Sequence, residues 1–117
     1  MVKEQQDFTM FSKNRIVLSV SVTDDDDIPV NLTSYPQIHW FMMNRPHSST
    51  WSISKSVGSG VSVSDAPNGI FIVTLTGSDT AGKTGSFYHE ALLIDDNSQS
   101  YTITIGTAKL RKSAFDR

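Results

Sequence analysis

The fold is decided by the stretch Ile16-Val-Leu-Ser-Val-Ser-Val22, in which apolar and polar residues alternate. Successive side chains of a β-strand point to opposite faces, so the even-numbered residues form one apolar face. Ser19 and Ser21 lie on the other face. This pattern predicts a strand with one side in a hydrophobic core and the other in water.

The same alternation recurs near the end of the chain, in Tyr101-Thr-Ile-Thr-Ile105. It predicts that Tyr101, Ile103 and Ile105 face inward, and that Thr102 and Thr104 face outward. Aromatic and β-branched residues favour further strands in 38–43, 51–54, 61–64, 70–75 and 87–94.

Turn-forming residues separate these strands. Asp24–Asp27 leads to Pro29, Asp65-Ala-Pro-Asn-Gly69 is a tight turn, and Asp95-Asp-Asn-Ser98 joins the last two strands as a hairpin. No stretch has a convincing helical pattern. About seven short strands with such turns predict an all-β fold, an antiparallel β-sandwich.

Composition narrows the class of protein. The 117 residues include ten Lys and Arg against twelve Asp and Glu, which argues against a broad basic surface for nucleic acid. Cysteine is absent, so disulfides and thiolate metal sites are excluded. We expect one soluble domain made in a reducing cytoplasm, because the start is polar and no run is long enough to span a bilayer.

Both ends differ from the predicted core. Residues 3–13 are polar apart from Phe8, Met10 and Phe11, and 109–117 hold four basic residues against one acidic residue. We predict an N-terminal arm over 1–13, the sandwich over 14–108 and a basic tail over 109–117. The two ends are equally consistent with frayed termini and with arms that become ordered on a partner.

One segment matches the Walker A pattern of nucleotide-binding proteins, Gly77-Ser-Asp-Thr-Ala-Gly-Lys-Thr84. A P-loop holds phosphate because it opens a helix. Here Gly85 and two aromatic residues follow, and the apolar stretch that ends at Asp95 arrives too soon for a helix and a crossover. We therefore interpret 77–84 as a loop between antiparallel strands, with no nucleotide cofactor.

Other candidate sites have simpler explanations. Asp24–Asp27 has the hard oxygen ligands that calcium prefers, but it lacks the glycine and distal Glu of an EF-hand. His39, His47 and His89 have no spacing typical of a metal site. Ser52 and Lys55 have the spacing of a catalytic pair, but they lie on a predicted strand. We expect neither a metal cofactor nor an enzymatic activity.

Three predicted strands are apolar on both faces, whereas a two-layer sandwich has only one inner face to bury. Their second faces need cover from the chain's own loops or from a partner. The hypothesis for a protein interface consists of Phe41, Met43, Ile70, Ile72, Leu92 and Ile94.

Residues 12–110 resemble immunoglobulin-like structural proteins of tailed phages and prophages, a family similar to the N-terminal domain of baseplate upper proteins. The resemblance rests on the opening strand, on Pro29-Val-Asn-Leu-Thr33, and on Asn68-Gly-Ile-Phe-Ile-Val-Thr-Leu75. It continues through Asp79-Thr-Ala81 and Gly85-Ser-Phe-Tyr-His-Glu-Ala91. It implies an immunoglobulin-like sandwich without catalytic residues.

The resemblance also implies a role. We expect a non-enzymatic structural component of a virion, such as a capsid decoration (cement), neck, tail or baseplate protein, made in the host bacterial cytoplasm. Its partners would be other virion proteins and copies of itself, with no nucleic acid and no membrane. The alternative is a carbohydrate- or host-surface-binding module, for which Trp51 and Tyr35 are the candidate aromatic platforms.

Overall fold

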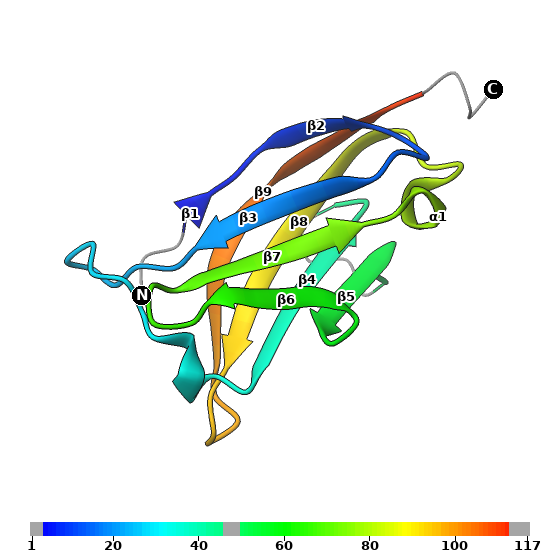
Figure 1. The fold of residues 1–117 in the computed structure, drawn as a ribbon. Coiled ribbons are helices and arrows are strands. Elements are labelled where there is room, and N and C mark those ends of the chain that lie inside the picture. The colour runs from blue at the N-terminus through cyan, green and yellow to red at the C-terminus, as the bar shows by residue number, and fades with distance from the viewer. Residues whose placement is uncertain (1–3, 46–49, 113–117) are drawn as a thin grey trace.

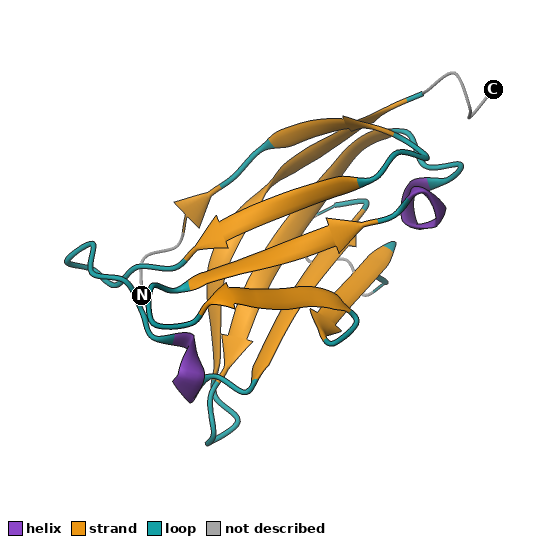
Figure 2. Ribbon diagram, in the orientation of Figure 1, coloured by secondary structure: helices purple, strands orange, loops and turns teal. Residues whose placement is uncertain are grey.

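The computed structural model describes residues 4–45 and 50–112. Within them nine strands belong to one hydrogen-bonded sheet, in the order β1-β9-β8-β4-β5-β6-β7-β3, with β2 also paired to β9 (Figures 1 and 2). The strands are β1 Glu4–Gln5, β2 Phe8–Phe11, β3 Ile16–Ser21, β4 Gln37–Met43, β5 Ile53–Val57, β6 Gly60–Asp65, β7 Ile70–Leu75, β8 Gly85–Ile94 and β9 Ser100–Arg111. The all-β prediction is confirmed. The sheet is mixed, however, and not purely antiparallel.

The sheet bends over itself and nearly closes into a barrel, so that β3, β7 and β6 lie across β9, β8 and β4 (Figure 1). Side chains from both sides of this bend fill the space between them. The largest buried ones are Trp40, Phe71, Ile38, Met42, Leu75, Leu93 and Ile103. Leu18, Val20 and Val22 are buried while Ser19 and Ser21 are exposed, as the alternation of the first strand predicts.

The bend is made at the β5–β6 corner. Gly58 and Gly60 have φ angles of 86° and 98°, which residues with a side chain rarely adopt. Ser56 and Val57 pair in parallel with Gly60 and Val61, a local contact of the turn itself, since ordinary parallel strands need a long crossover. This corner carries the chain from one layer into the other.

The predicted N-terminal arm is wrong for the residues that the structure describes. β1 and β2 are both strands, and they pair in parallel with β9. Met10 is buried in the core, and Phe8 packs against it. The predicted basic tail is also part of the sheet as far as Arg111, and residues 113–117 lie outside the described range.

β1 and β2 are separated by a break at Gln6 and Asp7. The Gln6 N–H still donates to Ile105 O on β9, at 2.8 Å, but the Gln6 carbonyl turns inward. It accepts a hydrogen bond from Nε2 of buried His89, at 2.6 Å. A carboxylate oxygen of Asp7 accepts from the Thr107 N–H at 2.8 Å, in place of a strand carbonyl. The break therefore leaves these backbone groups paired.

His89 holds this arrangement from inside the core. The indole Nε1–H of Trp40 donates to His89 Nδ1 at 3.2 Å, and an indole nitrogen can only donate. The ring is therefore neutral with its proton on Nε2, which donates to Gln6. Gly106 lies opposite His89 on β9, and a Cβ there would overlap the Gln6 carbonyl. Glycine is required because another backbone occupies that space.

A β-bulge interrupts β9 at Ile103. Ala91 pairs with Thr104 and Leu92 with Thr102, so one residue of β9 is extra. A one-residue shift reverses the faces of all later side chains. Thr104 is therefore buried and Ile105 half-buried on the outside, contrary to the alternation that predicts Ile105 inward and Thr104 outward. Ile103 is buried as predicted.

The predicted turns are confirmed. Gly69 ends the tight turn with a φ of 70°. Asp95 accepts the N–H groups of Asn97 and Gln99 in the last hairpin, and these bonds, with one from Tyr101, lower the pKa of its carboxyl. The two short helices are the 3₁₀ turn η1, Leu32–Ser34, and α1, Gly77–Thr80. No helix among the described residues is long and apolar enough to cross a membrane.

The glycine beneath the Gln6 carbonyl is open to a direct test. We expect Gly106→Ala to lower the free energy of unfolding by about 1–3 kcal/mol, the usual cost of overpacking. Hydrogen exchange should show lost protection at the Gln6 and Ser12 N–H groups, which bond to β9. Protection of the Val22 N–H, which bonds to Gly69, serves as the control. Unchanged stability and unchanged Gln6 protection would contradict this account.

The bulge also has a testable consequence for stability, because it buries the hydroxyl of Thr104. Thr104 is 1% exposed, and its hydroxyl has no hydrogen-bond partner within the described part of the chain. We expect Thr104→Val to raise the free energy of unfolding by about 1 kcal/mol, because an unsatisfied polar group leaves the core. Thr102→Val, on the outer face, should change stability little. Urea denaturation measures both, and a less stable Thr104→Val variant would refute the bulged register.

Candidate interaction surface

A group of half-buried and exposed, mostly apolar side chains lies on the outer face of β4, β8 and β9. Register pairs His39 with Leu92, and Phe41 with Glu90. Ile105 lies next to Glu90 on β9. We call this surface the β4–β8 face. It consists of His39, Phe41, Trp51, Leu92, Ile94 and Ile105.

A row of aromatic rings forms one side of this face. The rings of Phe41 and Trp51 stack with centroids 4.4 Å apart, and His39 stacks on Phe41 at 5.8 Å with nearly parallel planes. Trp51 is held at the start of β5, where the Ser52 N–H donates to Met42 O. It is nevertheless 54% exposed. An open indole beside apolar side chains is typical of a protein-binding or ligand-binding surface.

The β4–β8 face carries one negative group near its centre. Glu90 is half-buried between Phe41 and Ile105, its register neighbours. Burial, and to a smaller extent the charge of Glu90, raise the pKa of Tyr88 on the same strand. A partner surface would therefore have to offer a hydrogen-bond donor or a cation to Glu90, or leave it at the rim.

The six residues of the predicted interface do not form one surface. Phe41, Leu92 and Ile94 lie on the β4–β8 face. Ile70 and Ile72 lie on the outer side of β7, in the other layer, where Ile72 sits between Ser19 and Ser62. Met43 is 2% exposed, so its own chain already covers it. Sequence reasoning placed residues from two opposite faces together because alternation alone does not assign strands to layers.

Several residues of this face were not predicted. His39 shares a face with Phe41 by simple alternation, and that signal was available. The sequence predicts Trp51 as part of a strand over 51–54 and as a candidate platform for carbohydrate, but not as part of the protein interface. Ile105 was expected inside, because nothing in the repeated Thr-Ile pattern marks the bulge.

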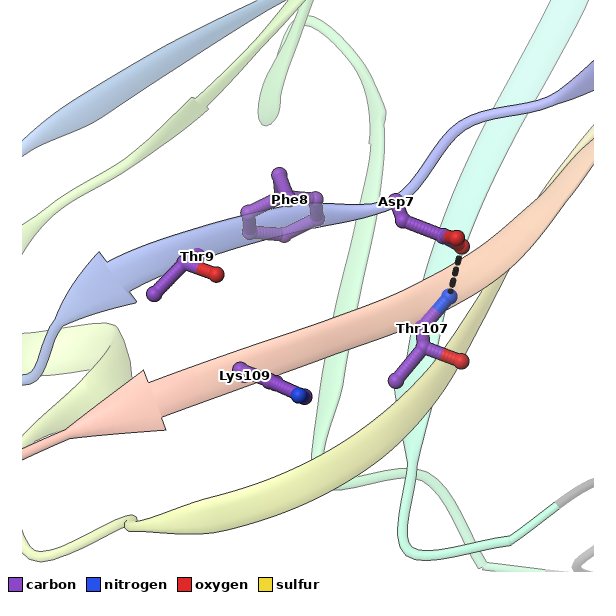
Figure 3. Close-up of a pocket in the computed structure, with 5 residues that line it drawn as sticks. All are labelled: Asp7, Phe8, Thr9, Thr107 and Lys109. Carbon is purple, nitrogen blue, oxygen red and sulfur yellow. Dashed lines mark hydrogen bonds between the residues drawn. The ribbon is translucent and has the colours of Figure 1, made fainter.

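A shallow pocket lies where β1 and β2 are separated. It is lined by Asp7, Phe8, Thr9, Thr107 and Lys109 (Figure 3). Asp7 already accepts the Thr107 N–H, and Figure 3 shows this bond joining the segment between β1 and β2 to β9. The Asp7 carboxylate is thus committed to the sheet. The pocket therefore has a structural origin in the break between β1 and β2.

The Walker-like segment ends at a strand. α1 occupies Gly77–Thr80, and β8 begins at Gly85, directly after the Lys83-Thr84 pair. The predicted strand after the segment is confirmed, but Gly77–Thr80 is a single helical turn where a loop was predicted, and the strands on either side, β7 and β8, do not pair with each other. The carboxylate of Asp79 caps the Thr76 N–H at 2.7 Å and pairs with Lys55 Nζ at 2.9 Å. Burial acts to raise the pKa of Asp79, but these contacts together lower it. Through Asp79, the segment connects the end of β7 to Lys55 on β5.

The acidic turn is organised by its own backbone. Asp24 Oδ1 accepts the N–H groups of Asp26 and Ile28, at 2.9 and 3.0 Å. Across the described ranges, no group of three or more His, Asp or Glu residues is placed to hold a metal ion. His39 is on the β4–β8 face, His89 is in the core and His47 lies outside the described residues.

No protein-family model matches this chain, and a search of the curated proteins finds no match.

The buried ring of His89 makes stability depend on pH. Burial is the main cause that lowers its pKa below 6.5, although the bond to Gln6 and the charge of Asp7 oppose this. As pH falls, the unfolded chain takes up this proton before the folded one. We expect the free energy of unfolding to be highest above about pH 6.5 and to decrease below it.

Denaturation between about pH 7 and pH 5 measures this dependence. His39→Asn serves as the control and should retain the decrease, because His39 lies outside the core. Stability that rises as the pH falls through this range would rule out a neutral His89.

Proposed function

We propose that this chain is a non-enzymatic structural protein of a tailed-phage virion, acting through protein–protein contacts with other virion proteins and with copies of itself. The observation that carries the proposal is the β4–β8 face, an ordered apolar surface that no other element of the described chain covers with a strand. Surfaces of this kind on small domains mark contact sites. The family resemblance of residues 12–110 supports the choice of a phage particle.

We also propose that the fold is immunoglobulin-like. The order β9-β8-β4-β5 followed by β6-β7-β3 is the order of strands G-F-C-C′ and D-E-B in a variable-type immunoglobulin domain. A buried tryptophan on strand C is a hallmark of such domains, and Trp40 occupies that place on β4. The parallel pairings and the near-closure of the sheet are departures from a plain seven-stranded sandwich.

Apolar residues on both layers suit a subunit with more than one neighbour. Phe41, Leu92 and Ile94 face one way, whereas Ile70 and Ile72 face the other. A capsid decoration, neck, tail or baseplate protein is surrounded by other subunits and can use two faces at once. In this proposal the protein works in the virion and requires no cofactor.

A carbohydrate- or host-surface-binding module is the second candidate, and Trp51 is the observation that favours it. Its indole is exposed and is held by the Phe41 ring. Sugar rings stack on such platforms. Tyr35 does not add to it, because it precedes the start of β4 and contacts Tyr101 instead.

Charge substitution on the face tests the first proposal. We expect Phe41→Glu to abolish incorporation into particles, because a carboxylate would be buried against an apolar partner beside Glu90. Asn97→Glu, in the exposed hairpin between β8 and β9 and on neither face, is the control and should be incorporated normally. Particles purified from the host on a density gradient are analysed by quantitative mass spectrometry, and circular dichroism checks folding. Normal incorporation of Phe41→Glu would remove this face from the account.

The same particles separate the two candidates. A structural protein should be present in many copies per particle, and Trp51→Ala should weaken its incorporation. A sugar-binding module should instead show quenching of tryptophan fluorescence by host-surface glycans, lost in Trp51→Ala, without any defect in particle assembly.

A further inference from the structure

The β3 edge is an unpaired strand edge with a regular hydrogen-bonding pattern. One side of β3 pairs with β7, and no strand among residues 4–45 and 50–112 pairs with the other. The Val22 N–H points toward β7, where it bonds to Gly69 O. Ser19 O points the opposite way, because the Gln6 side chain reaches it at 3.4 Å. By alternation, Val17, Ser19 and Ser21 direct their N–H and C=O groups to the open side.

This edge lacks the usual protection against pairing. Natural edge strands carry Lys, Pro or inward-pointing charges that block association. Between Ile16 and Ser21 there is no charge and no proline, and the exposed side chains are Val17, Ser19 and Ser21. Val17 is 43% exposed. The side chains of the strand therefore place no charge or proline in the way of a second strand beside it.

The two ends of the edge carry opposite charge. Lys13 and Arg15 precede β3, and Asp24–Asp27 follows it. Arg15, Asp25 and Asp26 are all exposed. A strand with a basic start and an acidic end is complementary to a second copy of itself in the antiparallel direction, because each basic end then meets an acidic end.

We propose that two copies of this chain pair through their β3 edges in an antiparallel, two-fold arrangement centred on Ser19. Ser19 would exchange both backbone hydrogen bonds with Ser19 of the second copy, and Val17 would do so with Ser21. Arg15 would lie beside the acidic turn of the other copy, near Asp25. The layer formed by β6, β7 and β3 then continues as one sheet across the pair.

This inference deepens the proposed function, on whose contacts between copies it rests, but it uses the β3 edge and not the sheet faces. Dimerisation is measured on the purified chain without particles, so it can fail while incorporation into particles succeeds. Within the described residues, the pairing displaces the bond from the half-buried Gln6 side-chain amide to Ser19 O, which is long at 3.4 Å. The inward bond from His89 to the Gln6 carbonyl is unaffected, so β1 and β2 stay on β9. In this pairing the Asp24–Asp27 run has a role, because it provides the negative charge opposite Arg15 of the second copy.

Charge exchange is the most specific test, with sedimentation velocity over a range of concentrations as the measurement. Wild-type protein should dimerise, more weakly at high salt. Arg15→Glu alone and Asp25→Lys alone should each weaken dimerisation about tenfold or more, because both contacts of the pair become repulsive. An equimolar mixture of the two variants should restore the dimer, since each contact is again between opposite charges. A mixture that stays monomeric would overturn the proposal.

A backbone substitution tests the register separately. Ser19→Pro removes an N–H that β7 does not use, so the folded monomer should persist and the dimer should be lost. Thermal unfolding confirms that the variant is folded. If it is not, Ser19→Lys replaces it, which places two like charges at the centre of the pair. A wild-type protein that is monomeric at all concentrations, or a folded Ser19 variant that dimerises normally, would refute the pairing.

Discussion

The hydrogen bond from His89 Nε2 to the Gln6 carbonyl determines which part of the sheet the N-terminal segment joins. It draws the backbone at Gln6 into the core, where Trp40 fixes the imidazole tautomer from the other side. The Gln6 carbonyl turns toward the buried ring and away from β9, and the Asp7 carboxylate accepts the Thr107 N–H in its place. Gly106 leaves the room that this crossing needs. A buried polar network of this kind is stable only when every member is satisfied.

The position of the N-terminal segment decides what the rest of the surface can do. Because β1 and β2 pair with β9, they do not cover β3. One layer therefore ends in an open strand, while the outer side of the other layer carries the stacked rings of Phe41, Trp51 and His39. A small domain without disulfides thus has both an edge and a face available for partners. Such a division suits a subunit of a larger assembly, as we propose.

Much of the architecture could be predicted from residue patterns, since alternation reports directly on which side of a strand is buried. The strands over 16–22 and 70–75, the Gly69 and Asp95 turns, and the strand behind Thr84 all follow from local chemistry. Two features do not. The Thr-Ile alternation continues unbroken through the bulge at Ile103, so the sequence carries no signal of it. The faces of Thr104 and Ile105 are therefore the reverse of those that the alternation predicts. The pairing of residues 4–11 with β9 depends on a contact between positions 6 and 89, distant in sequence.

The candidate site shows the same limit. Phe41, Leu92 and Ile94 were identified as an apolar second face, and they do lie together. Ile70 and Ile72 were grouped with them, although they face away on the other layer, and Met43 is covered by its own chain. Which strand belongs to which layer depends on the β5–β6 corner, where two glycines with positive φ redirect the chain. Residue types show that several strands have two apolar faces. Only the topology shows which layer each of these faces belongs to.

The central claim is that this protein acts through the surfaces of its two β-layers. It is tested most directly by hydrogen–deuterium exchange of the protein in intact particles, compared with the isolated chain. The account predicts that amides of β4 and β8 near Phe41 and Leu92 become more protected in the particle, with those around Asp7 unchanged. A particle in which β4 and β8 exchange as in the isolated chain, or from which this protein is absent, would contradict it.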